Sequence, residues 1–179
     1  YSERLWRIPS VFCVYRPGIR EPEKLGSIEY TPRPTPALRN GFITFGTLNN
    51  MGKVSDEVVA LWSDILRRVP GAKLLLEGVD FDKPVSRDKM YARFVPHGIG
   101  EERLILLTRD TAQQYLRYHE IDICLDPFPT NGGTTTCDIL WFGVPIVVLE
   151  GDSFVSRMGT SFLHAVGRTE WLCKTQNDY

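Results

Sequence analysis

The sequence lacks paired cysteine motifs, and its few cysteines are scattered. They are Cys13, Cys124, Cys137 and Cys173. None forms a C-x-x-C pair, and no histidine cluster accompanies them. This spacing excludes a zinc-finger type of site and gives no disulfide framework. We therefore interpret the cysteines as reduced, small hydrophobic residues.

Long apolar runs and a strong net charge are also missing. No apolar stretch approaches the roughly 18–20 residues of a transmembrane helix, and no signal peptide opens the chain. The formal net charge of -1 argues against a broad nucleic-acid-binding face or an anionic membrane surface. The default expectation is a cytoplasmic protein with no nucleic-acid or membrane partner. The first residue, Tyr1, is not a methionine, and no helix follows the last strand-like segment before Tyr179. We therefore expect a piece of a longer protein, truncated at its C-terminus.

The prolines divide the chain into three parts. Residues 1–16 mix aromatic and branched apolar side chains. Residues 17–40 contain five prolines, which remove the backbone donors that a central strand or helix needs. This segment is predicted to be a linker on the surface. The compact domain is predicted to span residues 41–179.

Within that domain, short apolar runs alternate with helical patterns. Buried strands are predicted at residues 42–45, 73–77, 104–107, 121–125, 144–149 and 171–173. Helices are predicted from Ser55 to Val69, over 85–98, from Thr111 through Tyr118, over 134–142 and over 155–166. Thr111 and Gln114 form a capping box. Continuous apolar strands, each followed by a helix, indicate an α/β, Rossmann-like parallel sheet with helices on both faces.

The chemistry is expected in the loops that follow the strands, because open parallel sheets bind ligands at their carboxyl edge. The loop 126–138 reads DPFPTNGGTTTCD. After Asn131, the glycines Gly132 and Gly133 allow a ligand to approach the backbone closely. Thr134 and Thr135 add hydroxyls where a helix begins and leaves N–H groups free, as a pyrophosphate requires. Asp138, one turn further, is placed to accept hydrogen bonds from ribose.

A second loop could supply a cation. Residues 45–53 read FGTLNNMGK and end in Lys53, just before the helix capped by Ser55. Taken alone, the glycines could form a simple turn and Lys53 could be solvated. Asp126, which ends its strand, could orient the Asn131 turn or face the ligand. The joint presence of both loops favours a phosphate site, although neither loop matches a P-loop or the G-x-G-x-x-G pattern.

These residues also carry a family resemblance. The stretch 45–53, the helix and strand over 61–76, the stretch 121–138, and the segments 140–145 and 151–157 resemble the catalytic region of O-GlcNAc transferases and their bacterial and plant SPINDLY-like relatives. Residues 1–4, with Pro9 and Phe12, are similar to the end of that family's other catalytic lobe. The resemblance implies the C-terminal lobe of a two-lobed GT-B glycosyltransferase. It also implies a UDP-sugar donor, UDP-GlcNAc first, and a protein acceptor, and tetratricopeptide repeats often lie upstream in the family.

The resemblance assigns roles to individual residues. Lys53 would contact the phosphates and stabilise the UDP leaving group, with Asn50 beside it. Gly133, Thr134 and Thr135 would hold the pyrophosphate, and Asp138 the ribose. Arg117 falls at a nucleotide contact of the family. Two departures reduce the match, because animal enzymes have a histidine at the position of Gly133 and a lysine for ribose in the helix that starts near Thr111.

The implied reaction is direct displacement at the anomeric carbon by a serine or threonine hydroxyl (in some relatives, an asparagine amide). Lys53 and helix N–H groups would stabilise the diphosphate, with no cofactor or metal required. A general base would belong to the missing N-terminal lobe, so this chain alone should bind better than it catalyses. Two alternatives stay open: a non-catalytic nucleotide-binding or interaction module, and a GT-B enzyme that acts on small molecules.

Overall fold

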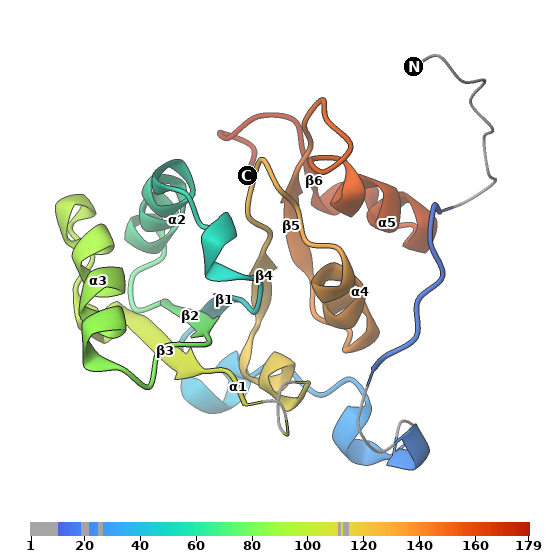
Figure 1. The fold of residues 1–179 in the computed structure, drawn as a ribbon, viewed down its shortest axis with the longest axis horizontal. Helices are drawn as coiled ribbons and strands as arrows, with labels where there is room; N and C mark the ends of the chain where they lie inside the picture. Colours follow the sequence, from blue (N-terminus) through green and yellow to red (C-terminus); the bar gives the residue numbers. More distant parts are fainter. Residues whose placement is uncertain (1–10, 19–21, 25–26, 111, 113–114) are drawn as a thin grey trace.

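The fold is built on one parallel sheet of six strands (Figure 1). The computed structural model of the chain describes residues 11–18, 22–24, 27–110, 112 and 115–179. The strand order is β3-β2-β1-β4-β5-β6, and every neighbouring pair is parallel. The strands are β1 (Thr44–Thr47), β2 (Lys73–Gly78), β3 (Leu104–Thr108), β4 (Ile123–Leu125), β5 (Ile146–Leu149) and β6 (Leu172–Cys173). This arrangement confirms the predicted Rossmann-like sheet.

Helices and short 3-10 turns connect the strands. The α-helices are α1 (Ala37–Asn40), α2 (Asp56–Arg68), α3 (Pro84–Phe94), α4 (Thr134–Trp141) and α5 (Met158–Val166). The 3-10 turns are η1 (Pro22–Lys24), η2 (Ile28–Tyr30), η3 (Met51–Lys53), η4 (Val95–His97), η5 (Glu101–Arg103), η6 (Leu116–Glu120) and η7 (Thr169–Trp171). Within the part of the chain that the structure describes, no helix has the length and hydropathy to cross a membrane.

Each face of the sheet has its own core, because successive side chains of a strand point to opposite faces. Leu74 and Leu76 of β2 pack with Trp62 and Leu66 of α2 on one face. Leu75, between them, packs on the other face with η6, α4 and α5. All of these leucines are at most 1% exposed. The expectation of helices on both faces is therefore confirmed.

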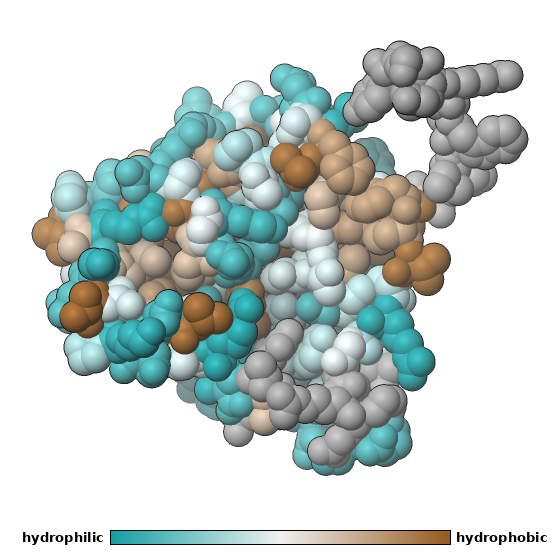
Figure 2. All heavy atoms as spheres, viewed as in Figure 1, coloured by the Kyte–Doolittle hydropathy of each residue, from teal (hydrophilic) through white to brown (hydrophobic). Residues whose placement is uncertain are grey.

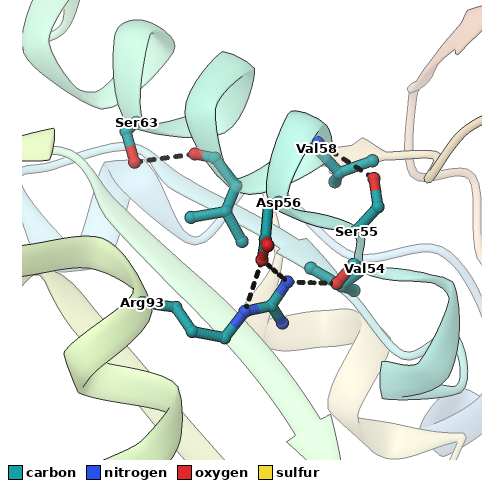
Figure 3. Close-up of polar contacts among 7 residues, drawn as sticks. Val54, Ser55, Asp56, Val58, Ser63 and Arg93 are labelled. Atoms are coloured by element: carbon teal, nitrogen blue, oxygen red, sulfur yellow. Dashed lines mark hydrogen bonds and ion pairs between the residues drawn. The ribbon is translucent and has the colours of Figure 1, made fainter. Parts of the chain in front are cut away.

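Helix α2 begins where the sequence predicts. The Ser55 side chain accepts a hydrogen bond from the Val58 N–H at 3.3 Å, which caps the first turn. Arg93 of α3 reaches the same end, because its guanidinium donates to the Val54 carbonyl at 2.6 Å and to Asp56 at 2.9 Å (Figure 3). The turn just after Lys53 is thus attached to a second helix.

Several element boundaries differ from the prediction. Strand β1 begins at Thr44 and includes Gly46, where a Cβ would lie 2.8 Å from the Ile121 side chain. Helix α5 begins at Met158, because Ser153 and Ser156 hydrogen-bond each other in a local turn before it. Helix α3 ends at Phe94, and Pro96 lies within the 3-10 turn η4 that follows it directly. The predicted capping box at Thr111 and Gln114 lies outside the described residues.

An extended segment, residues 11–17, which we call the strap, crosses α4 and α5. Val11, Cys13 and Tyr15 alternate along it and line an apolar cavity against the two helices. The Phe12 ring lies 5.4 Å from each of the rings of Phe154 and Phe162, centroid to centroid. Figure 2 shows apolar side chains gathered on this side of the molecule. The assignment of residues 1–16 to another lobe stays a prediction, and the first ten lie outside the described residues.

Asp122, directly before β4, hydrogen-bonds the segments that lead into the sheet. Its carboxylate accepts hydrogen bonds from the Thr44 N–H at 2.7 Å, from the Ala37 N–H at 2.8 Å and from the Thr35 hydroxyl. The side chain is buried at the amino edge of the sheet. Asp122 therefore joins α1 and β1 to β4.

Candidate functional site

The site lies where the strand order reverses. Strands β1 and β4 are neighbours in the sheet, with Phe45 paired to Ile123 and Gly46 to Cys124. The connection after β1 turns toward β2 on one side, and the connection after β4 turns toward β5 on the other. Open parallel sheets bind ligands outside the carboxyl ends of their strands at such a switch point, and we call this region the crevice. Both loops that the sequence analysis selected end at this crevice.

Lys53 joins the two loops. Its ammonium donates to the carbonyl oxygen of Asn131 at 2.8 Å and to the side-chain oxygen of Asn49 at 3.4 Å. A lysine ammonium has three donors, so one direction stays available. Among the described residues, Lys53 forms no ion pair with a carboxylate. Lys53 is half-buried and held between the two loops by these two contacts, and its role at a phosphate site stays a prediction.

The glycine-rich loop leads directly into helix α4. Gly133 is the N-cap residue, and its carbonyl accepts from the N–H groups of Thr136 at 3.0 Å and Cys137 at 3.2 Å. Within the described chain, the N–H groups of Gly133, Thr134 and Thr135 have no acceptor. Thr134 is exposed and Thr135 is half-buried. The helix thus presents free donors and its positive end to the crevice.

Gly132 is required by close packing. A Cβ at this position would overlap the Thr136 hydroxyl and lie 3.0 Å from Asp126 Oδ1 and 3.2 Å from Asn49 Nδ2. Gly133 is less constrained, because its Cβ would meet only the terminal methyl of Met158, at 2.7 Å. The two glycines therefore have different roles. Gly132 lets the loop backbone pack closely against Thr136 and Asp126, and Gly133 leaves its backbone open to a ligand.

Asp126 lies behind the crevice and orients the loop. Its Oδ1 accepts from the Gly132 N–H at 2.8 Å, so of the two roles considered for Asp126 this contact favours orientation of the Asn131 turn. The side chain is fully buried. Burial raises the pKa of Asp126 to about 7, although the Gly132 hydrogen bond, the Lys53 charge and the Asn49 hydrogen bond lower it. The loop is thus anchored on a buried acid.

Asp138, the predicted ribose contact, faces tyrosines. Its carboxylate accepts a hydrogen bond from the hydroxyl of Tyr15 on the strap, and it is only 4% exposed. Burial raises the pKa of Asp138 to about 6, and hydrogen bonds from Tyr15 and Tyr118 lower it. Contact with a ribose therefore requires the Tyr15 hydroxyl to share this carboxylate or to move.

The remaining predicted residues lie in local contacts. The Asn50 side chain accepts from the Gly52 N–H at 2.8 Å and caps η3, the turn that ends in Lys53. Arg117 of η6 forms an ion pair with Glu120 at 2.9 Å and no hydrogen bond to the glycine-rich loop among the described residues. The structure thus brings Lys53, Asn131 and Gly132 together, places Asn50 beside them, and does not join Arg117 to them.

Three residues of the site were not found from the sequence. Asn49, only 1% exposed, links Lys53 to Asp126. Tyr179 donates from its hydroxyl to the Asp126 carbonyl at 3.0 Å, and Tyr15 contacts Asp138. An asparagine beside Asn50 in a strand-end loop was a usable signal for Asn49. The two tyrosines gave none, because their contacts span 53 and 123 positions of the chain.

The described residues contain no group of three or more histidine, cysteine, aspartate or glutamate side chains that could hold a metal ion. The cysteines are unpaired thiols, and Cys124 is fully buried in β4. The positive groups within the two loops are Lys53 and the N-terminal end of α4, with Asp126 behind them, and Arg109 donates to the Leu48 carbonyl of the first loop at 3.4 Å. This combination can bind an anion with two or more phosphoryl oxygens.

An open parallel sheet whose strand order reverses between β1 and β4 defines a Rossmann-like α/β domain. The family model for Glycosyl transferase family 41 matches residues 21–179, and the chain belongs to this family. The fold is that of the C-terminal lobe of a GT-B glycosyltransferase. A solved structure of the Thermobaculum terrenum O-GlcNAc transferase mutant K341M superposes with a TM-score of 0.78 and 32% identity. It covers 86% of this chain and 29% of that one.

Curated relatives support the same family. The probable UDP-N-acetylglucosamine–peptide N-acetylglucosaminyltransferase SPINDLY of rice (Oryza sativa subsp. japonica) is 37% identical over 184 residues, which is 100% of this chain and 19% of the relative. The corresponding Arabidopsis thaliana protein is 36% identical over 182 residues, covering 99% of this chain and 19% of the relative. The UDP-N-acetylglucosamine–peptide N-acetylglucosaminyltransferase of Caenorhabditis elegans is 30% identical over 154 residues, 86% of this chain and 13% of the relative. The chain thus spans about a fifth of the length of its plant relatives. The recognised family and the glycosyltransferase class are confirmed.

Proposed function

We propose that this chain is the donor-binding lobe of a protein glycosyltransferase and that it holds the diphosphate of a UDP-sugar in the crevice between β1 and β4. The observation that carries the proposal is the 2.8 Å contact of the Lys53 ammonium with the Asn131 carbonyl. This contact places the only cation of the two loops at the entrance to the α4 N-terminus. UDP-GlcNAc is the donor named for the relatives and the first choice here.

The phosphates have donors on two sides. The N–H groups of Gly133, Thr134 and Thr135 would donate to one phosphoryl group, together with the positive end of α4. Lys53 would donate its free N–H to the second phosphoryl group and retain its hydrogen bond to Asn131. Asn50 would hold the turn that carries Lys53. These donors are in place before the ligand arrives, so little reorganisation is needed.

In the reaction, the acceptor hydroxyl attacks the anomeric carbon while the bond to the diphosphate oxygen breaks. Negative charge grows on that oxygen in the transition state, and Lys53 would stabilise it. Asp138 would accept from the ribose once Tyr15 shares its carboxylate. Arg117 would contact the nucleoside from η6. The acceptor is a serine, threonine or asparagine side chain of a protein, and its general base would come from a second lobe.

The test is a calorimetric titration of the chain with UDP and, separately, GDP. UDP should bind, and Lys53→Ala should weaken binding at least about tenfold, since a lost charge-assisted contact costs about 1.5–3 kcal/mol. Lys73→Ala is the matched control, because Lys73 starts β2 at the opposite edge of the sheet and lies over the Phe42 ring. Its UDP affinity should equal that of the wild type.

Three outcomes contradict parts of the proposal. Equal binding by the wild type and Lys53→Ala would remove Lys53 from the site. Preference for GDP would keep the site but change the donor. A folded chain that binds neither nucleotide would favour a non-catalytic interaction module.

A further inference from the structure

A continuous chain of hydrogen bonds connects the two loops behind the crevice. Lys53 donates to the Asn49 side-chain oxygen at 3.4 Å, and Asn49 Nδ2 donates to Asp126 Oδ1 at 3.4 Å. The Gly132 N–H donates to the same Asp126 oxygen at 2.8 Å. One carboxylate oxygen therefore receives a donor from each loop.

The central members of this chain are inaccessible to a ligand. Asp126 is 0% and Asn49 1% exposed. The Asp126 backbone is fixed as well, because the Tyr179 hydroxyl donates to its carbonyl at 3.0 Å. Asp126 can thus influence a bound phosphate only through the groups that it holds.

Burying an ionised carboxylate costs free energy unless hydrogen bonds or an opposite charge compensate for the lost hydration. The other end of β4 offers a comparison, since Asp122 is also buried but bonds only to the linker, α1 and β1. Asp122 organises the fold at the amino edge, whereas the partners of Asp126 belong to the two loops of the crevice. The two residues have similar burial and different partners.

We propose that Asp126 is a positioning residue of the diphosphate site, which sets the spacing between Gly132 and, through Asn49, Lys53. The inference rests on the proposed function. Asp126 fixes where the α4 N–H groups begin by holding Gly132. Asn49 fixes the direction of the Lys53 ammonium, so that the ammonium and the N–H groups face the same diphosphate.

A double-mutant cycle tests whether Asn49 acts through Lys53. Asn49→Ala should weaken UDP binding about fivefold or more in the wild-type background. In the Lys53→Ala background, the same change should have less than about a twofold effect, because Asn49 acts through Lys53. Equal fold-changes in both backgrounds would overturn the proposal. A purely structural role of Asn49 predicts that equality.

Conservative replacement provides a second test. Asp126→Asn keeps an oxygen that accepts from Gly132 and Asn49, so UDP affinity should stay within about threefold of the wild type. Asp126→Ala removes the acceptor and should lower the UDP affinity about tenfold or more. The matched control is Asp122→Ala, which should lower stability but leave the UDP affinity of the folded protein unchanged. An equal loss of affinity in Asp126→Asn and Asp126→Ala, or in Asp122→Ala, would overturn the proposal.

Hydrogen exchange separates this inference from the proposed function. The Gly132 amide should exchange at least about tenfold faster in Asp126→Ala than in the wild type and stay protected in Asp126→Asn, without any ligand. Unchanged protection in Asp126→Ala would show that Asp126 does not hold the loop. Absence of UDP binding by the wild type with the predicted exchange pattern would overturn the proposed function alone.

Discussion

The hydroxyl of Tyr15 donates a hydrogen bond to the carboxylate of Asp138 and joins residues 123 positions apart. Tyr15 lies on the strap, and Asp138 lies in the helix whose N-terminus faces the crevice. A residue that precedes the domain therefore completes the surroundings of its predicted ribose contact. Because the Tyr15 hydroxyl stabilises the ionised carboxylate, it opposes the rise in the Asp138 pKa that burial causes.

We predict a pH dependence of UDP binding that originates at Asp138. The pKa of this residue is raised to about 6, so the ionised form that would accept from the ribose in the proposed site is lost as the pH falls through that value. UDP affinity should drop severalfold from pH 7.5 to 5.5. Asp138→Asn is the reference titration, because it retains the titration of the UDP phosphate itself. Tyr15→Phe should move the midpoint to higher pH, and an unchanged midpoint would contradict the role of Tyr15.

The adjacent glycines should respond differently to alanine. Gly132→Ala places a methyl against the Thr136 hydroxyl and Asp126 Oδ1, so we expect a loss of about 1–3 kcal/mol in unfolding free energy and weaker UDP binding. Gly133→Ala meets only the flexible end of Met158 and should cost less than about 1 kcal/mol. Urea denaturation of both variants measures the difference. Equal losses would contradict the packing described for Gly132.

Stability should fall with rising pH because of Asp126. Its pKa in the folded chain is about 7, above the ordinary value of 3.8, so the folded state holds the proton more strongly than the unfolded state. This contribution is present near pH 4 and is lost as the pH rises through 7. Relative to Asp126→Asn, the wild type should lose about 2–3 kcal/mol between pH 5 and pH 8. Urea denaturation at these two pH values measures the change, and a pH-independent difference would be inconsistent with a raised pKa.

Replacing Arg93 should lower the unfolding free energy more than removing its ion-pair partner Asp56. Arg93→Ala removes the donor to the Val54 carbonyl next to Lys53 and should cost about 1–2 kcal/mol. Asp56 is 95% exposed on its side chain, so Asp56→Ala should cost less than about 1 kcal/mol. Chemical denaturation compares the two variants. A larger loss for Asp56→Ala would show that the ion pair, rather than the carbonyl contact, holds α3 to α2.

The sequence predicted most of the fold because the local signals agreed. Apolar runs such as 73–77 and the Ser55 cap both indicated alternating strands and helices. Strands β1 to β6 begin within two residues of their predicted starts. The prediction of the start of α5 failed because a local turn forms there instead of the first turn of the helix. Residues 155–157 were predicted as helix, but the Ser153–Ser156 turn satisfies their neighbours' hydrogen bonds instead.

The site was predicted in part for the same reason. The glycines and threonines indicate an open backbone at the start of a helix, and Lys53 precedes a capped helix. Both loops could therefore be selected from the sequence. Their meeting was not encoded locally, because it depends on the pairing of β1 with β4. The contacts of Tyr15 with Asp138 and of Asn49 with Asp126 depend on the same three-dimensional arrangement.

The pairing of Phe45 with Ile123 makes the site a seam between two halves of the chain. Lys53 belongs to the half that contains β1, β2 and β3, and the glycine-rich loop to the half that contains β4, β5 and β6. A slip of one residue along this seam would displace one loop against the other by about 3.3 Å and reverse the faces of its strand. A diphosphate bound across the seam would therefore contact both halves of the chain and stabilise the register of β1 with β4.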